Sequence, residues 1–463
     1  MEALTVSEIL EATGGRLLAH FDEFAAITEV DTDSRTMHEN SLFVPLVGEN
    51  FDGHRYLEQA LDKGALGCLT QNEVSDCRPD RFYIQVEDTM TALGNLARFY
   101  RNKFDIKVVG VTGSVGKTTT KDMVASVLSR KYSVLKTQGN FNNNIGVPKT
   151  LFQLEKGHEI AVVEMGMNHA GEIDYLTRIA QPDVAIITNI GDAHIENLGS
   201  RENTLQAKAE IFHGLKQDGI AVLNGDDPLL CKLDGRLIHP IVWCGEGENS
   251  SFRCKDIRET TGDCMALEAE TPLGELKAKI HCLGRHLYHP ALKAAAVGSH
   301  FGMTLEEITA GIEDFAPTKM RMDVIRCKNG ITILNDTYNA NPQSMRAAVD
   351  VLAKYSGSYR VAVLGDMFEL GELGPVLHES VGNFVGHSGI DCLITVGELG
   401  GMIAQGARNV GMSEVYDRPD KEEAKVVLNQ VLQPGTVFLC KASRGMRFEE
   451  IVDYLKRLTE CEE

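Results

Sequence analysis

Residues 107–120 have the residue types and the spacing of a phosphate-binding loop. The β-branched run at 107–112 is typical of a strand, and a Gly-rich turn follows it before a helix begins at Lys117. In such a turn, backbone N–H groups and the positive end of the helix dipole point at the same place, which suits a polyphosphate. The Lys117 ammonium group would neutralise phosphate oxygens, and the Thr118 hydroxyl group could bind Mg²⁺.

The spacing of this loop departs from the general P-loop pattern, which has Gly five positions before Gly116, where this chain has Val111. One alternative is a Gly-rich turn that binds no ligand. The Gly-Lys-Thr sequence after a strand favours a nucleotide loop instead, and the altered spacing indicates a variant subclass. We expect the nucleotide to contact Gly113, Ser114, Val115, Gly116, Lys117, Thr118 and Thr119.

Two more candidates follow predicted strands of the same parallel sheet, where ligands of such sheets bind. Glu164 ends the run at 159–164, and its carboxylate is either a Mg²⁺ ligand or a solvated strand end. His194 comes after the run at 183–188. An isolated His is more often structural or exposed than a metal ligand, so the pattern alone does not assign it.

Lys208 occupies an unusual position on a predicted helix at 201–215. Leu205, Lys208, Phe212 and Leu215 follow a 3-4-3 spacing, which places the lysine on the apolar stripe. Lysine is rarely buried without a partner. Either its stem packs on the apolar surface while the ammonium group reaches water, or the side chain is chemically altered to serve a site.

Polar side chains also gather towards the two ends of the chain. Residues 335–342 follow a strand and form either an Asx-rich turn with a helix N-cap or a binding loop, with Arg321 and residues 441–444 supplying cations nearby. Residues 33–35 form either an Asx-type turn with a solvated Arg or a diphosphate site. The candidates here are Ser34, Arg35, Asp336, Tyr338, Asn339 and Asn341.

Length and composition restrict the class of protein. A chain of 463 residues favours about three domains. The formal charge of −20 argues against broad nucleic-acid binding, which needs a basic face. Eleven scattered cysteines without a Cys-x-x-Cys pair indicate reduced thiols. The acidic start of the sequence is unlike a signal peptide, and no apolar run reaches membrane-spanning length. We therefore expect a soluble cytoplasmic monomer without membrane insertion.

The order of strand and helix patterns predicts an α/β protein of three domains. Residues 1–85 form a small α/β unit, and a helix at 89–103 joins it to the next. Residues 86–315 alternate short apolar strands with helices, as in a mostly parallel sheet covered on both faces, with a β-rich extension at 240–282. Residues 316–463 form a second, Rossmann-like α/β unit without a phosphate loop of its own.

Taken together, these motifs resemble the Mur ligases, the ATP-dependent ligases of peptidoglycan synthesis. Residues 112–120 match the nucleotide loop of that family, including its departure from the ordinary P-loop. Residues 33–35, 42–46 and 52–54 resemble the uridine-nucleotide domain of the MurE and MurF members. Residues 335–345 and 364–371 are characteristic of MurF, and the Asp-Asn-Pro-Arg-type motif expected of MurE does not occur.

The resemblance implies roles for the ambiguous residues. Glu164 matches a Mg²⁺ ligand of the family, His194 a histidine associated with a second Mg²⁺, and Lys208 a lysine that is carbamylated, which would turn a cation into a metal-binding anion. With Lys117, these three form the expected catalytic set, and Thr118 is the fourth metal-binding position. Residues of the third domain would complete the nucleotide site, namely Arg321, Asp336 and Tyr338.

The same resemblance implies the reaction. ATP would activate the carboxylate of UDP-MurNAc-tripeptide as an acyl phosphate, and D-alanyl-D-alanine would then displace phosphate to give the pentapeptide precursor of peptidoglycan. Ser34 and Arg35 would bind the UDP-linked substrate, and Asn339, Asn341 and Asp366 the dipeptide. The alternatives are MurE, a ligase similar to folylpolyglutamate synthase, and a nucleotide-binding homologue that has lost catalysis.

Two positions depart from the pattern of the family. The adenine motif often reads His-Asn-x-x-Asn-Ala-Leu, whereas this chain has Leu287 and Pro290 in place of the two Asn residues. Pro290 cannot supply the amide that reads a base. Ala442 replaces the Gly of the usual Lys-Gly-Ser-Arg, a small change.

Overall fold

The computed structural model describes residues 1–193 and 195–460. By their contacts these residues fall into two compact units. The first comprises Met1–Thr112, Lys131–Ile186 and Ala207–Ala221, and the second comprises Gly113–Arg130, Ile187–Gln206 and Val222–Glu463. The division passes through the central part of the chain, so the predicted central domain contributes to both units.

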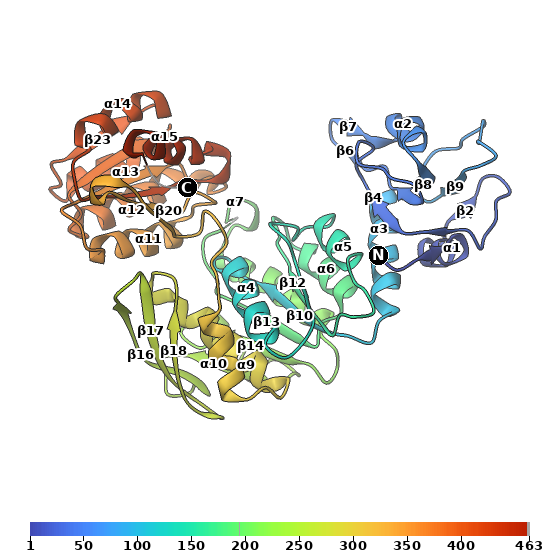
Figure 1. Cartoon of the computed structure of the whole chain (residues 1–463), viewed down its shortest axis with the longest axis horizontal. Coiled ribbons are helices and arrows are strands. Elements are labelled where there is room, and N and C mark those ends of the chain that lie inside the picture. The colour runs from blue at the N-terminus through green and yellow to red at the C-terminus, as the bar shows by residue number, and fades with distance from the viewer. Residues whose placement is uncertain (194, 461–463) are drawn as a thin grey trace. The chain divides into compact units, whose positions relative to one another are not determined.

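The N-terminal part is a small α/β fold (Figure 1). Its first helix begins at a capping box, in which Thr5 and Glu8 satisfy each other's backbone N–H groups. The main sheet has the order β2-β9-β8-β5-β4. The elements are β1 (Leu4–Thr5), α1 (Val6–Thr13), β2 (Arg16–Leu17), β3 (Ala26–Ile27), β4 (Glu29–Asp31), β5 (Ser41–Phe43), β6 (Val47–Gly48), β7 (Phe51–Asp52), α2 (Leu57–Asp62), β8 (Ala65–Thr70), β9 (Phe82–Gln85) and α3 (Thr89–Asn102).

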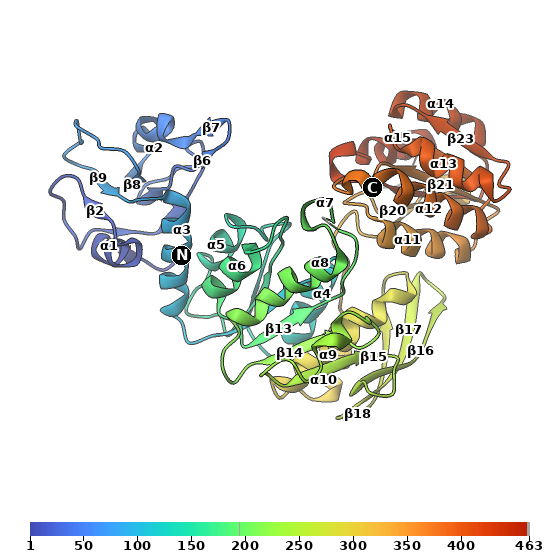
Figure 2. The ribbon, with the colours of Figure 1, turned by 180° about the vertical axis from the view of Figure 1, so that it is seen from behind.

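The central part carries a sheet of order β11-β12-β10-β13-β14-β15-β16-β17-β18. Strands β10, β11 and β12 are parallel, and β16–β18 form an antiparallel extension beside α9 and α10 (Figure 2). The strands are β10 (Lys107–Thr112), β11 (Val134–Lys136), β12 (Ile160–Glu164), β13 (Val184–Ile187), β14 (Ile220–Asn224), β15 (Ile241–Gly245), β16 (Phe252–Thr260), β17 (Cys264–Thr271) and β18 (Gly274–Ile280). The helices are α4 (Lys117–Leu128), α5 (Gly146–Leu151), α6 (Glu172–Ala180), α7 (Ile195–Leu198), α8 (Arg201–Ala209), α9 (Tyr288–His300) and α10 (Leu305–Glu313).

The C-terminal part has a sheet of order β19-β20-β24-β21-β22-β23, in which only the β19–β20 pair is antiparallel among the described residues. The strands are β19 (Asp323–Arg326), β20 (Thr332–Asn335), β21 (Tyr359–Gly365), β22 (Cys392–Val396), β23 (Val415–Arg418) and β24 (Thr436–Lys441). The helices are α11 (Pro342–Lys354), α12 (Gly374–His387), α13 (Gly400–Asn409), α14 (Lys421–Val431) and α15 (Glu449–Thr459).

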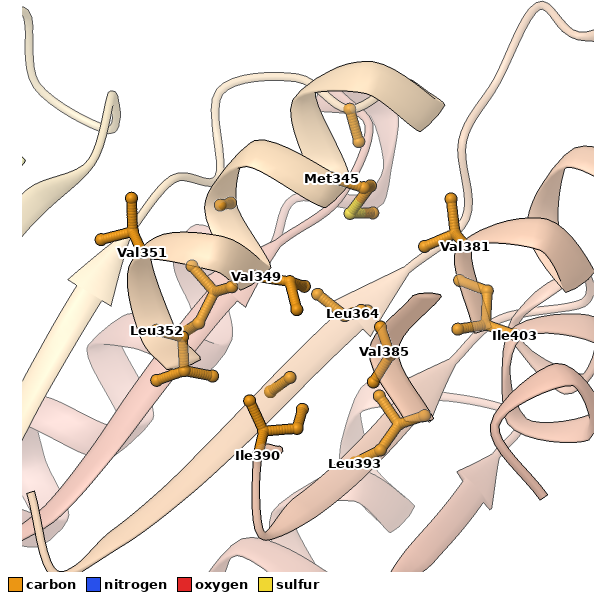
Figure 3. Packing of buried hydrophobic residues seen from close by; sticks show 14 of the residues in the cluster. Met345, Val349, Val351, Leu352, Leu364, Val381, Val385, Ile390, Leu393 and Ile403 are labelled. Carbon is orange, nitrogen blue, oxygen red and sulfur yellow. The ribbon is translucent and has the colours of Figure 1, made fainter. Parts of the chain in front are cut away.

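One face of this C-terminal sheet is packed by α11, α12 and α13. Figure 3 shows Leu352 of α11, Val385 of α12 and Ile403 of α13 directed towards Leu364 and Leu393 of the strands. All five side chains are completely buried. Because the strands carry apolar residues on both faces, α14 and α15 cover the other face, as a parallel sheet requires.

The α/β class predicted from the sequence, with a partly parallel central sheet, is confirmed, and two local expectations are not. The helix predicted at 201–215 ends at Ala209, and a 3₁₀ helix, η2 (Glu210–His213), follows. Cys327 is disulfide-bonded, so the prediction of reduced thiols is wrong at that position. A search of the described residues finds no helix of sufficient length and hydropathy to cross a bilayer.

Candidate nucleotide and metal sites

The loop between β10 and α4 depends on two glycines. Gly116 is the N-cap of α4 with φ 79°, and Gly113 has φ 145°, both in the region that favours glycine. A Cβ atom on Gly113 would lie 1.8 Å from Oγ1 of Thr188. The loop therefore fits against the residue after β13, and a side chain at Gly113 would push the two segments apart.

The segment that follows β13 holds this loop by hydrogen bonds. The Thr188 hydroxyl and the Asn189 side-chain amide both donate to the carbonyl oxygen of Val115, at 2.6 and 3.0 Å, and Oδ1 of Asn189 accepts from the Val115 N–H at 2.9 Å. The Gly191 N–H donates to Oγ of Ser114 at 2.8 Å. The side chain of Ser114 thus shapes the loop. Our sequence reasoning missed Thr188 and Asn189, although their place after a strand was a usable signal.

Lys117 and Thr118 occupy the first turn of α4. Nζ of Lys117 donates to the Gly113 carbonyl oxygen at 2.9 Å, which keeps the ammonium group at the loop. Thr118 is buried, and its Oγ1 lies 3.5 Å from Nη2 of Arg321. The guanidinium carbon of Arg321 lies 4.0 Å from the ring centroid of Tyr338, a cation–π arrangement. The structure therefore brings these two residues of the third predicted domain to the phosphate loop.

A cavity of about 210 Å³ opens beside this loop, within the second unit. Loop residues and charged side chains of both signs line one side, namely Val115, Gly116, Thr119, Arg321, Asp336 and Lys441. Its apolar side is formed by Leu287, Pro290, Phe315 and Pro317. The two residues that depart from the adenine motif, Leu287 and Pro290, thus line the cavity and contribute to its apolar side.

Asp336 is held at the cavity by a buried lysine. Nζ of Lys441 lies 2.6 Å from Oδ2 of Asp336 and donates to the Asn339 carbonyl oxygen at 2.8 Å. Burial lowers the pKa of Lys441, and the nearby Asp336 carboxylate opposes that shift. The Met322 N–H donates to the second oxygen of Asp336 at 3.2 Å. The carboxylate therefore has a fixed orientation.

The three residues proposed for a dipeptide have structural contacts of their own. Asn341 is the N-cap of α11, where its Oδ1 accepts from the Ser344 N–H at 2.9 Å, and this confirms the N-cap interpretation of the turn. Oδ1 of Asn339 accepts from the Ala340 N–H at 2.9 Å. The two oxygens of Asp366 accept from backbone N–H groups after β22, each at 3.0 Å. Dipeptide binding by these residues stays a prediction.

The first unit carries two buried residues that were predicted to bind a metal, Glu164 and Lys208. Glu164 ends β12, and Nδ2 of Asn142 donates to its Oε1 at 2.8 Å. Lys208 on α8 is also buried. Buried oxygen donors such as those of Glu164 and Thr118 are the ligands that Mg²⁺ prefers, whereas a lysine ammonium group has no lone pair and fits only as a carbamate. His194 lies outside the described residues.

Within 1–193 and 195–460, no three His, Cys, Asp or Glu side chains form a group that could hold a metal. Mg²⁺ is commonly bound by one or two carboxylates together with substrate phosphates, rather than by a complete protein cage. The chemistry of the donor set is therefore compatible with Mg²⁺ bound together with a nucleotide.

The N-terminal candidates lie on a turn after β4. Oγ of Ser34 donates to Oε1 of Gln59 at 2.9 Å. Arg35 is exposed and pairs with Asp33 at 2.8 Å, and its hydrogen bonds lower the pKa of Asp33 to about 2. An exposed guanidinium group with an anionic neighbour can exchange that neighbour for a phosphate. Of the two residues of the predicted diphosphate site, Arg35 is thus accessible from solvent, whereas Ser34 is buried.

The contact between Gly113 and Thr188 predicts that G113A loses nucleotide binding. The new Cβ cannot fit at 1.8 Å from Oγ1 of Thr188, and we expect the Kd for ADP to rise by about 100-fold, as when a preorganised phosphate loop is displaced. Isothermal titration calorimetry measures this Kd. The matched control is G157A, because a Cβ at Gly157 meets no atom within 4 Å. An unchanged Kd for G113A would contradict this account of the loop.

The buried imidazole beside Asp366 predicts a loss of stability in acid. Burial lowers the pKa of His378, whose Nδ1 donates to the Gly374 carbonyl oxygen at 2.7 Å while Nε2 accepts from the Met367 N–H at 2.9 Å. Protonation would break the second bond. The unfolded chain therefore binds the proton more tightly, and below pH 6.5 the free energy of unfolding should fall by up to about 1.4 kcal/mol per pH unit.

Urea unfolding at about pH 7.5 and pH 5.5 measures this difference, and H378Q should show a smaller loss on acidification than the wild type. The control is H387Q, which changes an exposed residue of the same helix. Equal acid sensitivity of H378Q and the wild type would show that His378 is not the group responsible.

Comparisons with known proteins agree along the whole chain. Family models match residues 26–101 (Mur ligase family, catalytic domain), 111–298 (Mur ligase middle domain) and 320–444 (Mur ligase, glutamate ligase domain). A UDP-N-acetylmuramoyl-tripeptide–D-alanyl-D-alanine ligase of Bacillus subtilis is 40% identical over 97% of each chain. MurF of Acinetobacter baumannii is 33% identical, with a TM-score of 0.92 over 99% of each chain. MurF of Thermotoga maritima, solved with ADP, is 30% identical, with a TM-score of 0.84 over 93% of this chain and 98% of that one. The chain is a member of the Mur ligase family.

Proposed function

We propose that this chain is the ATP-dependent ligase that joins D-alanyl-D-alanine to UDP-MurNAc-tripeptide. One observation carries the proposal: relatives named for that reaction match this chain over nearly its full length. Among those described above, the sequence identity reaches 40%. The cavity beside the phosphate loop supports it, because it combines a helix N-terminus and cations with an apolar surface for a base. The relative solved with ADP supports a nucleotide as ligand.

In the first step a carboxylate oxygen of the tripeptide attacks the γ-phosphorus of ATP. The bond to the β–γ bridging oxygen breaks, which gives an acyl phosphate and ADP. The loop at Gly113–Thr119 would orient the phosphates, and the ammonium group of Lys117 would offset the charge that develops on them. Arg321, fixed over the ring of Tyr338, supplies a second cation at the same loop.

In the second step the neutral amine of D-alanyl-D-alanine attacks the acyl carbon. The C–O bond to phosphate breaks as the amide forms, and the amine proton passes to the departing phosphate or to solvent. ATP and the UDP-linked tripeptide are both anionic, so catalysis is chiefly positioning and neutralisation of charge. We place the dipeptide near Asn339, Asn341 and Asp366. Because Asn341 and Asp366 already organise backbone N–H groups, their contribution would be to shape the pocket as well as to contact the ligand.

Mg²⁺ is the metal that we propose for this reaction. When bound, it would neutralise phosphate oxygens and thereby lower the barrier to attack on phosphorus. Thr118, Glu164 and Lys208 as a carbamate are the proposed ligands in the described part of the chain, and His194 is proposed for a second ion. A carbamate would also explain why a lysine occupies a buried position, since it exchanges a cation for an anion that the metal neutralises.

The UDP end of the substrate is assigned to the N-terminal domain, at Ser34 and Arg35. We retain the boundaries 1–85, 86–315 and 316–463 for the substrate, ATP-binding and C-terminal domains. The proposed reaction uses nucleotide-linked precursors and ATP, so we place the enzyme in the cytoplasm, as a monomer.

A substrate exchange tests the proposed function. With UDP-MurNAc-tripeptide, ATP and Mg²⁺, we expect phosphate release on addition of D-alanyl-D-alanine and none with a free diamino acid. A coupled phosphate assay and mass spectrometry of the UDP-linked product measure the result. Release only with the diamino acid would identify a MurE-type ligase instead, and inactivity with both amines would favour a homologue without catalysis.

Replacement of Lys208 tests the carbamate. K208A should lower kcat by at least about 100-fold, because a metal-binding anion is lost from the site. The control is K216M, which changes a lysine that pairs with Asp183 and has no assigned role. A readout independent of activity is the carbamate carbon resonance of protein equilibrated with ¹³C-bicarbonate, expected for the wild type and absent from K208A. A wild-type spectrum without that resonance would overturn the assignment.

A further inference from the structure

One ion pair in the first unit joins the turn proposed to bind the UDP group to the segment that contacts Glu164, the proposed metal ligand. Nζ of Lys149, on helix α5, lies 2.7 Å from Oδ1 of Asp31, which ends β4. The two side chains are 28% and 14% exposed, so the pair is shielded from solvent more than a typical surface pair. An exposed pair contributes little to stability, and shielding strengthens the attraction.

Asp31 organises the turn that carries Ser34 and Arg35. Its Oδ1 accepts from the N–H groups of Thr32 and Asp33, at 2.7 and 3.3 Å. Its Oδ2 accepts from the Thr36 hydroxyl at 2.5 Å. Burial by itself would raise the pKa of Asp31, but the hydrogen bonds and the charge of Lys149 outweigh that effect and lower it. The carboxylate is therefore charged and fixes both ends of the turn.

The segment that leads to Lys149 begins at the metal-binding candidate. Asn142 donates to Oε1 of Glu164 at 2.8 Å, and its carbonyl oxygen accepts from the Gly166 N–H at 2.7 Å. Oδ1 of Asn143 then accepts from the N–H of Gly146, the first residue of α5, at 2.9 Å. Residues 142–149 are thus anchored to the end of β12 on one side and to the Asp31 turn on the other.

The proposed substrate explains why such a connection would be needed. Its UDP group and its reacting carboxylate lie at opposite ends of one molecule, and a nucleophile must reach its target within a few tenths of an ångström. We propose that Lys149 is a positioning residue, which through Asp31 fixes the UDP-binding turn relative to the segment that orients Glu164. This inference rests on the proposed function, because it is that function which assigns a UDP-linked substrate to the turn.

Variant kinetics separate positioning from general stability. K149M should raise the KM for UDP-MurNAc-tripeptide by about tenfold, with the KM for ATP changed by less than about twofold. K149R should restore most of the affinity because it keeps the charge. D31N should resemble K149M, and the double variant should be no worse than either single one, since both remove the same contact.

The matched control is K103M. Lys103 pairs with Glu8 at 2.6 Å, with side chains 32% and 30% exposed, and it also connects two helices of the first unit. We expect wild-type kinetics from K103M. The positioning role would be overturned if K149M and K103M raised the KM for UDP-MurNAc-tripeptide equally. It would also be overturned if K149M raised the KM for ATP as much as the KM for UDP-MurNAc-tripeptide.

Hydrogen–deuterium exchange of the free protein gives a readout that does not depend on the reaction. In K149M the amides of Thr32, Asp33 and Arg35 should exchange faster, with those of α1 unchanged. Unaltered exchange in the turn would overturn the inference. If the wild-type protein did not use UDP-MurNAc-tripeptide, the proposed function would be wrong. The pair would then have no role in placing that substrate, even if the hydrogen–deuterium exchange of the turn changed in K149M.

Discussion

The close approach of Gly113 to Thr188 is the constraint on which the proposed nucleotide site depends. The chain must leave β10, turn and enter α4 within a few residues, and the backbone conformations at Gly113 and Gly116 make that turn possible. Thr188 and Asn189 then hold the carbonyl and N–H groups of Val115. A loop fixed in this way would need little reorganisation to bind the phosphates of the proposed nucleotide.

Buried charges determine how the surrounding residues are oriented. Lys441 and Asp336 form a shielded pair at the cavity, and Arg321 is positioned by Tyr338. A buried charge that loses its partner is costly, so these side chains have few alternative conformations. This local concentration of cations explains how a chain of net charge −20 can accommodate anionic ligands: the field at the site, rather than the total charge, decides the interaction.

Elements with strong periodic or apolar patterns were predictable from the sequence. The strands at 107–112, 160–164 and 184–187 and the helix after Gly116 lie close to where their residue patterns placed them. The helix carrying Lys208 was predicted too long, because the spacing of Phe212 and Leu215 is also compatible with the 3₁₀ turn that follows Ala209. The spacing of apolar residues cannot distinguish an α-helix that continues past Ala209 from a 3₁₀ turn that begins there, since tertiary packing decides where a helix ends.

The sequence by itself determined the family, the phosphate loop and the types of residue available for catalysis, because these depend on short motifs whose local geometry follows from residue type. Tertiary structure decided which partners those residues have. It placed both oxygens of Asp366 against backbone N–H groups and paired Asp31 with Lys149. Such contacts join residues as many as 118 positions apart, and no local pattern encodes them, because only the folded chain brings the two side chains within reach.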